Sequence, residues 1–415
     1  MKRGVAVRLF SRVTIILLFL TILVATASAG QVTFSGDARV RYIVKNNYLF
    51  GNLDSSTNDY WTSRVRINVF AKAAGGAYAK GRLRMDVTKW GDPDPDKLPW
   101  VDIAYIGVPM GPTVLEAGNM KSNLTRFFQY DQSADQARLS WDMFESTWTA
   151  IYRILNEGAE SEYAVDRNED NDNVSYGLTA VKPFLSDWTA KGHLFYQDDQ
   201  RNPYTSGTYV KPSDGFFWSV FLDGKIGEMK LETEVAFKAA DVRQSRDNSG
   251  AIINQRNVSM GNGWGWYIEG GYPMGSFTPI LNIGIAANGY DADNDFGWLM
   301  IGNSNNEPIS VISQVGEAGD WYWIAPSLIY NPINKLSMRA NFVYVDLNVG
   351  DQRDLEFQFA RLYELSGELT YMISDGASFT WKLGLLKPEI NGLIDGNPAK
   401  EDTAFGTYGR VQINF

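Results

Sequence analysis

Apolar and polar residues alternate along much of the chain with a period of two. In the last segment, residues 405–415, the odd positions are Phe, Thr, Gly, Val, Ile and Phe, whereas positions 408, 410, 412 and 414 are Tyr, Arg, Gln and Asn. Successive side chains of a β-strand point to opposite faces. A strand with one apolar and one charged face suits a closed barrel whose outside meets lipid and whose inside meets water.

The same alternation recurs throughout the chain and predicts about 18 strands of roughly 9 to 15 residues. We expect them to begin near residues 32, 60, 77, 100, 113, 134, 145, 173, 186, 214, 228, 261, 276, 320, 335, 359, 376 and 403. The pattern is weakest over residues 100–120 and around Pro326, because proline interrupts a strand ladder. A barrel of 16 strands therefore remains open.

The lengths of the links between these segments also alternate. Short links follow the even-numbered segments and lie at 74–76, 109–112, 144, 183–186, 227, 273–275, 331–334 and 375–376. Longer polar links follow the odd-numbered segments and lie near 45–59, 89–99, 121–133, 157–172, 199–213, 242–260, 291–319, 349–358 and 388–402. This order predicts an up-and-down transmembrane barrel with short periplasmic turns, long extracellular loops and both termini on the periplasmic side.

The first residues indicate export. Lys2, Arg3, Arg8 and Arg12 precede the apolar run 13–24, and Ala27-Ser28-Ala29 has the small residues of a cleavage site. We therefore divide the chain into a signal peptide, 1–29, and a barrel, 30–415. Loss of four of the 38 basic residues leaves 34 against 48 acidic ones, so a nucleic-acid partner is not expected.

The chain has no cysteine, which excludes disulfides, thiolate metal sites and covalent haem attachment. No second apolar stretch is long enough for a transmembrane helix. Neither cofactor nor enzymatic activity is expected, because the single histidine, His193, has no serine motif beside it. Its position instead predicts a side chain on the lumenal face.

With its leader, its first strand over 34–42 and its terminal Phe415, the chain resembles the Gram-negative outer-membrane porins of the 16- to 18-stranded type. The likeness extends over the whole length. It implies passive diffusion of small hydrophilic solutes through a water-filled lumen in the bacterial outer membrane, with lipid and lipopolysaccharide around the barrel and a possible homotrimer. It also implies that an extracellular loop can fold inward and narrow the pore.

Charged positions on the inward faces predict how that lumen treats solutes. One wall is expected to be basic, formed by Arg39, Arg41, Arg64, Arg66, Lys72, Lys80, Arg82, Arg84 and Arg410, with only Asp37 and Asp86 beside them. The facing wall is expected to be acidic, formed by Asp223, Glu232, Glu234, Glu364 and Glu368. Opposed walls would orient polar solutes, whereas a basic ladder would select small organic anions, and both uses remain open. Plain lumen polarity is the third interpretation.

The link 291–319 is the longest and contains apolar residues at 296 and 298–301, which favours a loop folded into the barrel mouth. The link around Arg126, Phe127 and Phe128 is the second candidate. Asp291, Asp293 and Asp295 are spaced like the start of a calcium loop, but Gly297 is one position late and the closing glutamate is missing, so calcium is a weak hypothesis. A sheath around a partner protein or an exported polymer is the alternative to a diffusion channel.

Overall fold

A computed structural model describes most of the chain. It covers residues 30–48, 57–87, 89–91, 99–156, 173–199, 204–205, 208–210, 215–240, 245–246, 252–254, 263–316, 320–348, 357–394, 397–398 and 401–415. The expected signal peptide and the acidic link 157–172 lie outside these residues. The described residues contain no helix whose length and apolar character would suit a membrane crossing.

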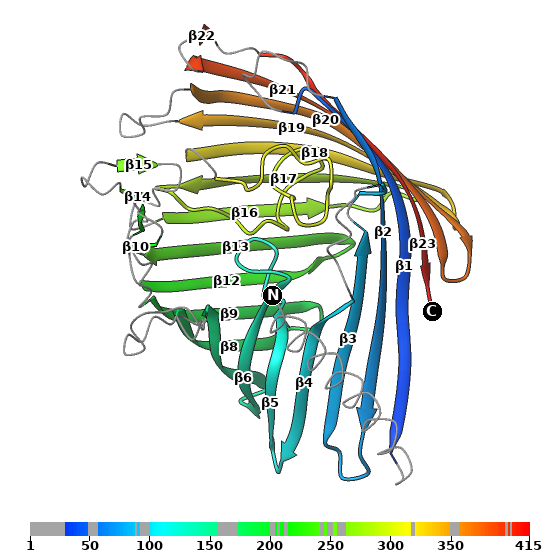
Figure 1. Cartoon of the computed structure of the whole chain (residues 1–415), viewed down its shortest axis with the longest axis vertical. Coiled ribbons are helices and arrows are strands. Elements are labelled where there is room, and N and C mark those ends of the chain that lie inside the picture. The colour runs from blue at the N-terminus through cyan, green and yellow to red at the C-terminus, as the bar shows by residue number, and fades with distance from the viewer. Residues whose placement is uncertain are drawn as a thin grey trace, which may run out of the picture.

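Eighteen antiparallel strands close into a barrel (Figure 1). Each strand pairs with its neighbours in chain order, and β1 closes the ring by pairing with both β2 and β23. The strands are β1 (Gln31–Asn46), β2 (Thr57–Lys72), β3 (Tyr78–Val87), β4 (Trp100–Met110), β5 (Thr113–Ser122), β6 (Gln132–Met143), β7 (Ser146–Asn156), β8 (Asn173–Phe184), β9 (Trp188–Asp199), β12 (Gly215–Ile226), β13 (Met229–Ala240), β16 (Gly263–Gly271), β17 (Phe277–Ala287), β18 (Asp320–Ile333), β19 (Leu336–Asn348), β20 (Phe357–Ser374), β21 (Ala377–Ile394) and β23 (Ala404–Asn414).

The predicted strands and the number 18 are confirmed, and each barrel strand begins within about three residues of its expected start. The two weak regions hold complete strands. β4 and β5 occupy 100–122, and β18 continues through Pro326, whose backbone faces a partner in β17 at Leu281. The alternative of 16 strands is therefore wrong.

Several strands are longer than expected. β20 and β21 have 18 residues each. Their pairing continues past the outward apolar side chains Leu365 and Leu385 into a polar stretch, where Arg361 pairs with Glu389 at 2.9 Å. The sequence pattern located only the apolar band, because its alternation ends where the strands leave that band.

The connections sort by length as predicted. Links of two to five residues join β2–β3, β4–β5, β6–β7, β8–β9, β12–β13, β16–β17, β18–β19 and β20–β21 at one end of the barrel. The other end has the long connections, which include the short strands β10 (Tyr204–Thr205), β11 (Thr208–Val210), β14 (Ser245–Arg246), β15 (Ile252–Asn254) and β22 (Asn397–Pro398). Figure 1 shows the labelled short strands β10, β14, β15 and β22 at that end.

The outer face of the ring is apolar. Exposed outward side chains include Phe34, Ile106, Val220, Leu281, Leu365, Val411 and Ile413. Residues of the opposite parity on the same strands point inward, as the alternation requires: Asp37, Asn282 and Glu364 are buried on the inside. The barrel thus presents apolar side chains outward and polar ones inward.

Two long connections fold into the barrel instead of extending from its end (Figure 1). They are residues 123–131, between β5 and β6, and residues 288–316, between β17 and β18. We call them together the loop block. Its buried side chains, among them Phe127, Phe296, Met300, Ile301 and Ile309, form the main hydrophobic core of the molecule, inside the ring.

Candidate functional site

The register of β23, β1, β2 and β3 gathers arginines on one lumenal wall, which we call the arginine wall. Three pairs face each other directly across neighbouring strands: Arg41 with Arg410, Arg39 with Arg64, and Arg66 with Arg84. Like charges at directly opposed positions destabilise a sheet. Their concentration here therefore has an energetic cost that other interactions must offset.

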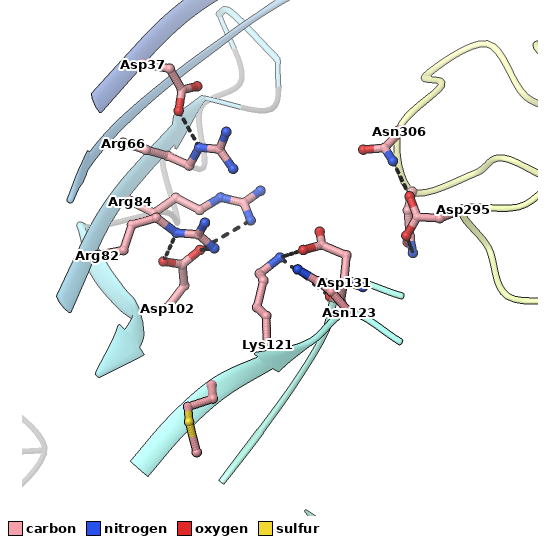
Figure 2. A network of polar contacts seen from close by, with 12 residues as sticks. Asp37, Arg66, Arg82, Arg84, Asp102, Lys121, Asn123, Asp131, Asp295 and Asn306 are labelled. Atoms are coloured by element: carbon pink, nitrogen blue, oxygen red, sulfur yellow. Dashed lines mark hydrogen bonds and ion pairs between the residues drawn. The ribbon is translucent and has the colours of Figure 1, made fainter. Parts of the chain in front are cut away.

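Aspartates offset this cost in one half of the wall, over β2 and β3. Asp37 pairs with Arg64 at 3.1 Å and with Arg66 at 2.6 Å. Arg82 forms two hydrogen bonds of 2.7 Å with the Asp102 carboxylate, and Arg84 pairs with Asp86 at 2.5 Å. Figure 2 shows Arg66, Arg84 and Arg82 in a row, with Asp37 at one end of the row and Asp102 at the other.

The other half of the wall lacks such neutralisation. Within the described part of the chain, no carboxylate lies within ion-pairing distance of Arg39, Arg41 or Arg410. Arg41 and Arg410 donate to hydroxyl groups, of Thr62 and Thr380, at 3.3 Å each. The Nε atoms of Arg39 and Arg410 are buried without a hydrogen-bond partner. These three guanidinium groups therefore carry charge that no ion pair in the described structure neutralises, which favours an anion beside them.

Two inward carboxylates contact the loop block: Glu234 on β13, on the far side of the ring, and Glu364 on β20, which only β21 separates from β23 of the arginine wall. Glu364 is 0% exposed, and its two oxygens accept hydrogen bonds from the backbone N–H groups of Leu299 and Met300 at 3.1 Å each. Glu234 is also 0% exposed and accepts a hydrogen bond from the Thr125 hydroxyl at 2.6 Å. These two side chains thus lie beneath the loops, which separate them from the open lumen.

The remaining predicted acidic residues differ among themselves. Glu232 accepts a hydrogen bond from Tyr267 and lies 3.6 Å from Arg126. Glu368 pairs with Lys382 at 2.7 Å. Asp223 is half-buried on β12, opposite Glu232 in the register. The predicted acidic side chains thus lie at two places, on β12 and β13 and on β20 near the arginine wall, and they are engaged mainly with cations, hydroxyl groups or the loops.

The loop block has carboxylates of its own on the side facing the arginine wall: Asp131 is partly exposed, whereas Asp293 and Asp295 are buried. Figure 2 shows Asp295 with Asn306 on one side and Arg66, Arg82 and Arg84 on the other, with Lys121 and Asp131 between the two groups. Burial, helped by the negative charges of Asp293 and Asp131, raises the pKa of Asp295 to about 6. The loop side is thus partly negative near neutral pH.

The aspartates of the weak calcium hypothesis are used in hydrogen bonds. Asp293 accepts from the Asp295 backbone N–H at 3.2 Å and from Gln132 at 2.9 Å, and Asp295 accepts from the side-chain amides of Asn305, at 3.1 Å, and Asn306. The backbone carbonyl of Asp291 accepts from Lys238. Among the described residues, no group of three or more acidic, histidine or cysteine side chains is arranged to hold a metal ion.

Some residues of the site have no counterpart in the sequence analysis. Asp102 lies in the region with the weakest strand pattern. Lys121 contacts Asp131, Arg138 adds a half-buried arginine on β6, and Arg153 on β7 is buried where it donates to Gln129 of the loop block. Extending the inward parity of each strand to β6 and β7 would have identified Arg138 and Arg153. Asp102 is skipped where the register between β3 and β4 shifts, and Lys121 has the parity of the exposed Leu115, so alternation alone could not have identified them.

His193 lies on the inward face of β9, as expected, but beneath a loop. Its ring stacks on Phe128 with centroids 6.1 Å apart. It faces Ser219 across β9 and β12, and both are buried, at 5% and 1% exposure. The imidazole nitrogens and the serine oxygen have no hydrogen-bond partner, so they are not bonded to each other.

Comparison with known proteins adds evidence on the fold. No protein-family model and no curated protein matches the chain. Solved structures do match over nearly the full length. OprD of Pseudomonas aeruginosa has a TM-score of 0.54 at 13% identity, with 92% of this chain and 95% of that chain covered.

Two further structures give similar values. OccAB1 of Acinetobacter baumannii has a TM-score of 0.58 at 10% identity, covering 92% of this chain and 97% of that one. A BenF-like porin from Pseudomonas fluorescens Pf-5 has 0.57 at 9% identity, covering 93% and 98%. At these identities the likeness is one of fold: the chain has the closed 18-strand barrel of outer-membrane porins.

Proposed function

We propose that the protein is an outer-membrane porin through which small hydrophilic solutes diffuse, and that it favours solutes with an anionic group. The observation that supports this most directly is the contrast between the two faces of the ring. The outer face carries exposed apolar side chains, and the inner face carries the arginine wall. A barrel of this size is not filled by its wall side chains alone, so a wet path can remain beside the loop block.

The preference for anions follows from the uneven pairing of the arginines. Arg64, Arg66, Arg82 and Arg84 share three aspartates, whereas Arg39, Arg41 and Arg410 have none within ion-pairing distance in the described structure. A carboxylate moving along β1–β3 would exchange one guanidinium for the next without passing through an uncharged gap. Small organic anions are therefore the solute class we expect.

A channel is a better proposal than an enzyme. His193 and Ser219 are the residues that could suggest catalysis, and both are buried, His193 against the Phe128 ring of the loop block. A solute in the lumen could not reach them unless the loop moved. The similar solved structures include a porin, which agrees with this choice.

We expect the outward apolar face to contact outer-membrane lipid. Beyond it, at the long-loop end, the outward residues Arg361, Glu389 and Asp346 are polar and would suit the lipopolysaccharide headgroup region. A homotrimer is a further prediction, which mobility on a native gel after mild detergent extraction tests.

The test of the channel is conductance of the purified protein in a planar lipid bilayer. We expect stable single-channel steps and, in a salt gradient, a reversal potential on the anion side. Neutralising the unpaired arginines by Arg39→Gln, Arg41→Gln and Arg410→Gln together should lower the anion-to-cation permeability ratio several-fold. The matched control is Arg361→Gln, which removes one outward positive charge at the long-loop end.

Two results would contradict the proposal. Absence of conductance from a folded barrel would favour the alternative of a sheath around a partner protein or polymer. Equal ion selectivity in the parent and the triple variant would mean that the arginine wall does not lie along the permeation path.

A further inference from the structure

The inward face of the barrel has recesses that match side chains of the loop block. They occur at wall glycines, where a Cβ atom would collide with a loop residue. A Cβ at Gly384 of β21 would lie 2.6 Å from Cγ of Met300, and a Cβ at Gly406 of β23 would lie 2.7 Å from Cβ of Ile309. Real Cβ atoms essentially never come so close, so each recess is already occupied by the loop.

A third recess holds the shorter loop. A Cβ at Gly265 of β16 would lie 2.6 Å from the Phe127 ring and 2.7 Å from the Tyr290 ring. Phe127 and Tyr290 belong to the two different loops, so one recess receives side chains from both. The wall is thus shaped to the loops at β16, β21 and β23.

Polar contacts also hold the loop block against the wall. Glu364 accepts the backbone N–H groups of Leu299 and Met300 next to the Gly384 recess. Glu307, on the longer loop, accepts hydrogen bonds from Lys382 at 2.5 Å and from the Tyr408 hydroxyl at 2.9 Å. Withdrawal of the loop would break these hydrogen bonds and expose the buried apolar side chains of Leu299 and Met300 to water, which is costly.

The two loops also hold each other. The Phe127 ring lies 4.7 Å from the Phe296 ring, and the Phe127 carbonyl accepts hydrogen bonds from the Tyr290 hydroxyl at 2.9 Å and the Asp293 N–H at 3.1 Å. Neither loop can leave alone without breaking this contact. They behave as one packed unit.

We propose that the loop block is a fixed lining of the pore, locked to the wall by Gly265, Gly384 and Gly406, and that it does not withdraw to admit solutes. The constriction would then have one permanent width, and the path would follow the arginine wall. The statement that solutes follow the arginine wall rests on the proposed function, whereas the immobility of the loop block does not.

Cysteine labelling tests the immobility without any transport assay, because the chain has no cysteine of its own. Ile301 is 0% exposed in the block, and Phe144 is 77% exposed in a short turn. In the folded barrel in detergent, Ile301→Cys should resist a water-soluble maleimide while Phe144→Cys reacts at once. Labelling of Ile301→Cys at the rate of Phe144→Cys would overturn the proposal even if the protein conducts no ions.

Single-channel recording tests the recess itself. Gly384→Ala should displace the loop and give a larger and noisier conductance than the parent, because the buried Met300 has little room to yield. Adding Met300→Ala removes the Cγ and Sδ atoms that the new methyl group meets, so the double variant should return toward the parent conductance and noise. Gly192→Ala is the control, since a Cβ there meets open space.

The outcomes separate the two proposals. If Gly384→Ala alone conducts like Gly192→Ala and the parent, or if adding Met300→Ala does not reverse its effect, the recess does not fix the constriction and this inference fails. If the parent does not conduct at all, the proposed function fails, and cysteine labelling alone decides whether the block is fixed.

Discussion

Carboxylates inside this barrel divide into two groups according to whether the loop block covers them. Asp37 and Asp102 lie in the arginine wall and neutralise pairs of guanidinium groups. Glu234 and Glu364 lie beneath the loops and accept their hydrogen bonds. The first group shapes the charge that a solute meets, and the second holds the structure that narrows its path.

Asp295 allows a prediction about pH, because it lies in a loop facing the arginine wall. Burial raises its pKa to about 6, so the carboxyl group gains a proton as the pH falls through that value. Loss of this negative charge makes the lumen more positive. Lowering the pH from about 7.5 to about 5 should therefore increase anion selectivity, measured as the reversal potential in a salt gradient.

Asp295→Asn provides the control for this experiment. It removes the titrating group but keeps a side chain of similar size beside Asn305 and Asn306. The variant should show the low-pH selectivity already at neutral pH, and its reversal potential should change less with pH than that of the parent. An identical pH dependence in both proteins would contradict the assignment.

The alternation of apolar and polar residues shows which side chains lie on the inner face of a strand. It does not show what covers them. Glu364 and Arg66 follow the same period-two alternation, yet one is buried under Met300 and the other faces Asp37 in the lumen. The difference depends on where residues 288–316 fold, which is decided by contacts between segments far apart in the sequence. The inward parity of the arginines was therefore predictable, and the burial of Glu234 and Glu364 was not.

At the scale of the element, alternation and link length were sufficient to locate all eighteen strands, including β4 and β5, where the pattern was weakest. The reason is that every strand faces lipid on one side and polar groups on the other, so each carries the same signal. Loops carry no such repeat. The apolar residues 296 and 298–301 indicated an inward fold, but the recesses at Gly384 and Gly406 could be found only once β21 and β23 were placed.

Gly118 in β5 provides a test of strand geometry. Its φ is +132°, and a Cβ there would lie 2.3 Å from the Ala104 carbonyl oxygen on β4. Gly118→Ala should therefore strain the β4–β5 pair and lower the free energy of unfolding by about 1 to 3 kcal/mol. Urea unfolding of the folded barrel, followed by tryptophan fluorescence, measures the loss.

Gly81 on β3, the strand that pairs with the other side of β4, serves as the matched control. A Cβ at Gly81 would have its nearest contact at 3.9 Å, with the Ile103 carbonyl oxygen. Gly81→Ala should leave the unfolding midpoint close to that of the parent. Equal midpoints for Gly118→Ala and Gly81→Ala would show that the backbone at position 118 is not constrained as the structure indicates.

At the scale of the whole molecule, closure of the ring brings the two ends of the described chain together. β1 and β23 pair from Asp37 with Asn414 to Asn46 with Phe405. The seam lies within the arginine wall, since Arg41 and Arg410 face each other across it. The repulsion there must be offset by the rest of the seam, so its terminal contacts matter for assembly.

Phe415 makes those terminal contacts. Its carbonyl accepts a hydrogen bond from the Gly36 N–H at 2.6 Å, its N–H donates to the Gly36 carbonyl at 3.0 Å, and its ring lies so close to Gly36 that a Cβ there would be 2.6 Å from it. Deleting Phe415 removes both hydrogen bonds and the ring, and should reduce the fraction of chains that close, measured by heat-dependent gel mobility after refolding into lipid. Phe415→Ala keeps the backbone bonds and should give an intermediate fraction. If the deletion variant closes as completely as the parent, the seam does not depend on this residue, and the pairing from Asp37 to Asn46 is sufficient to overcome the repulsion between Arg41 and Arg410.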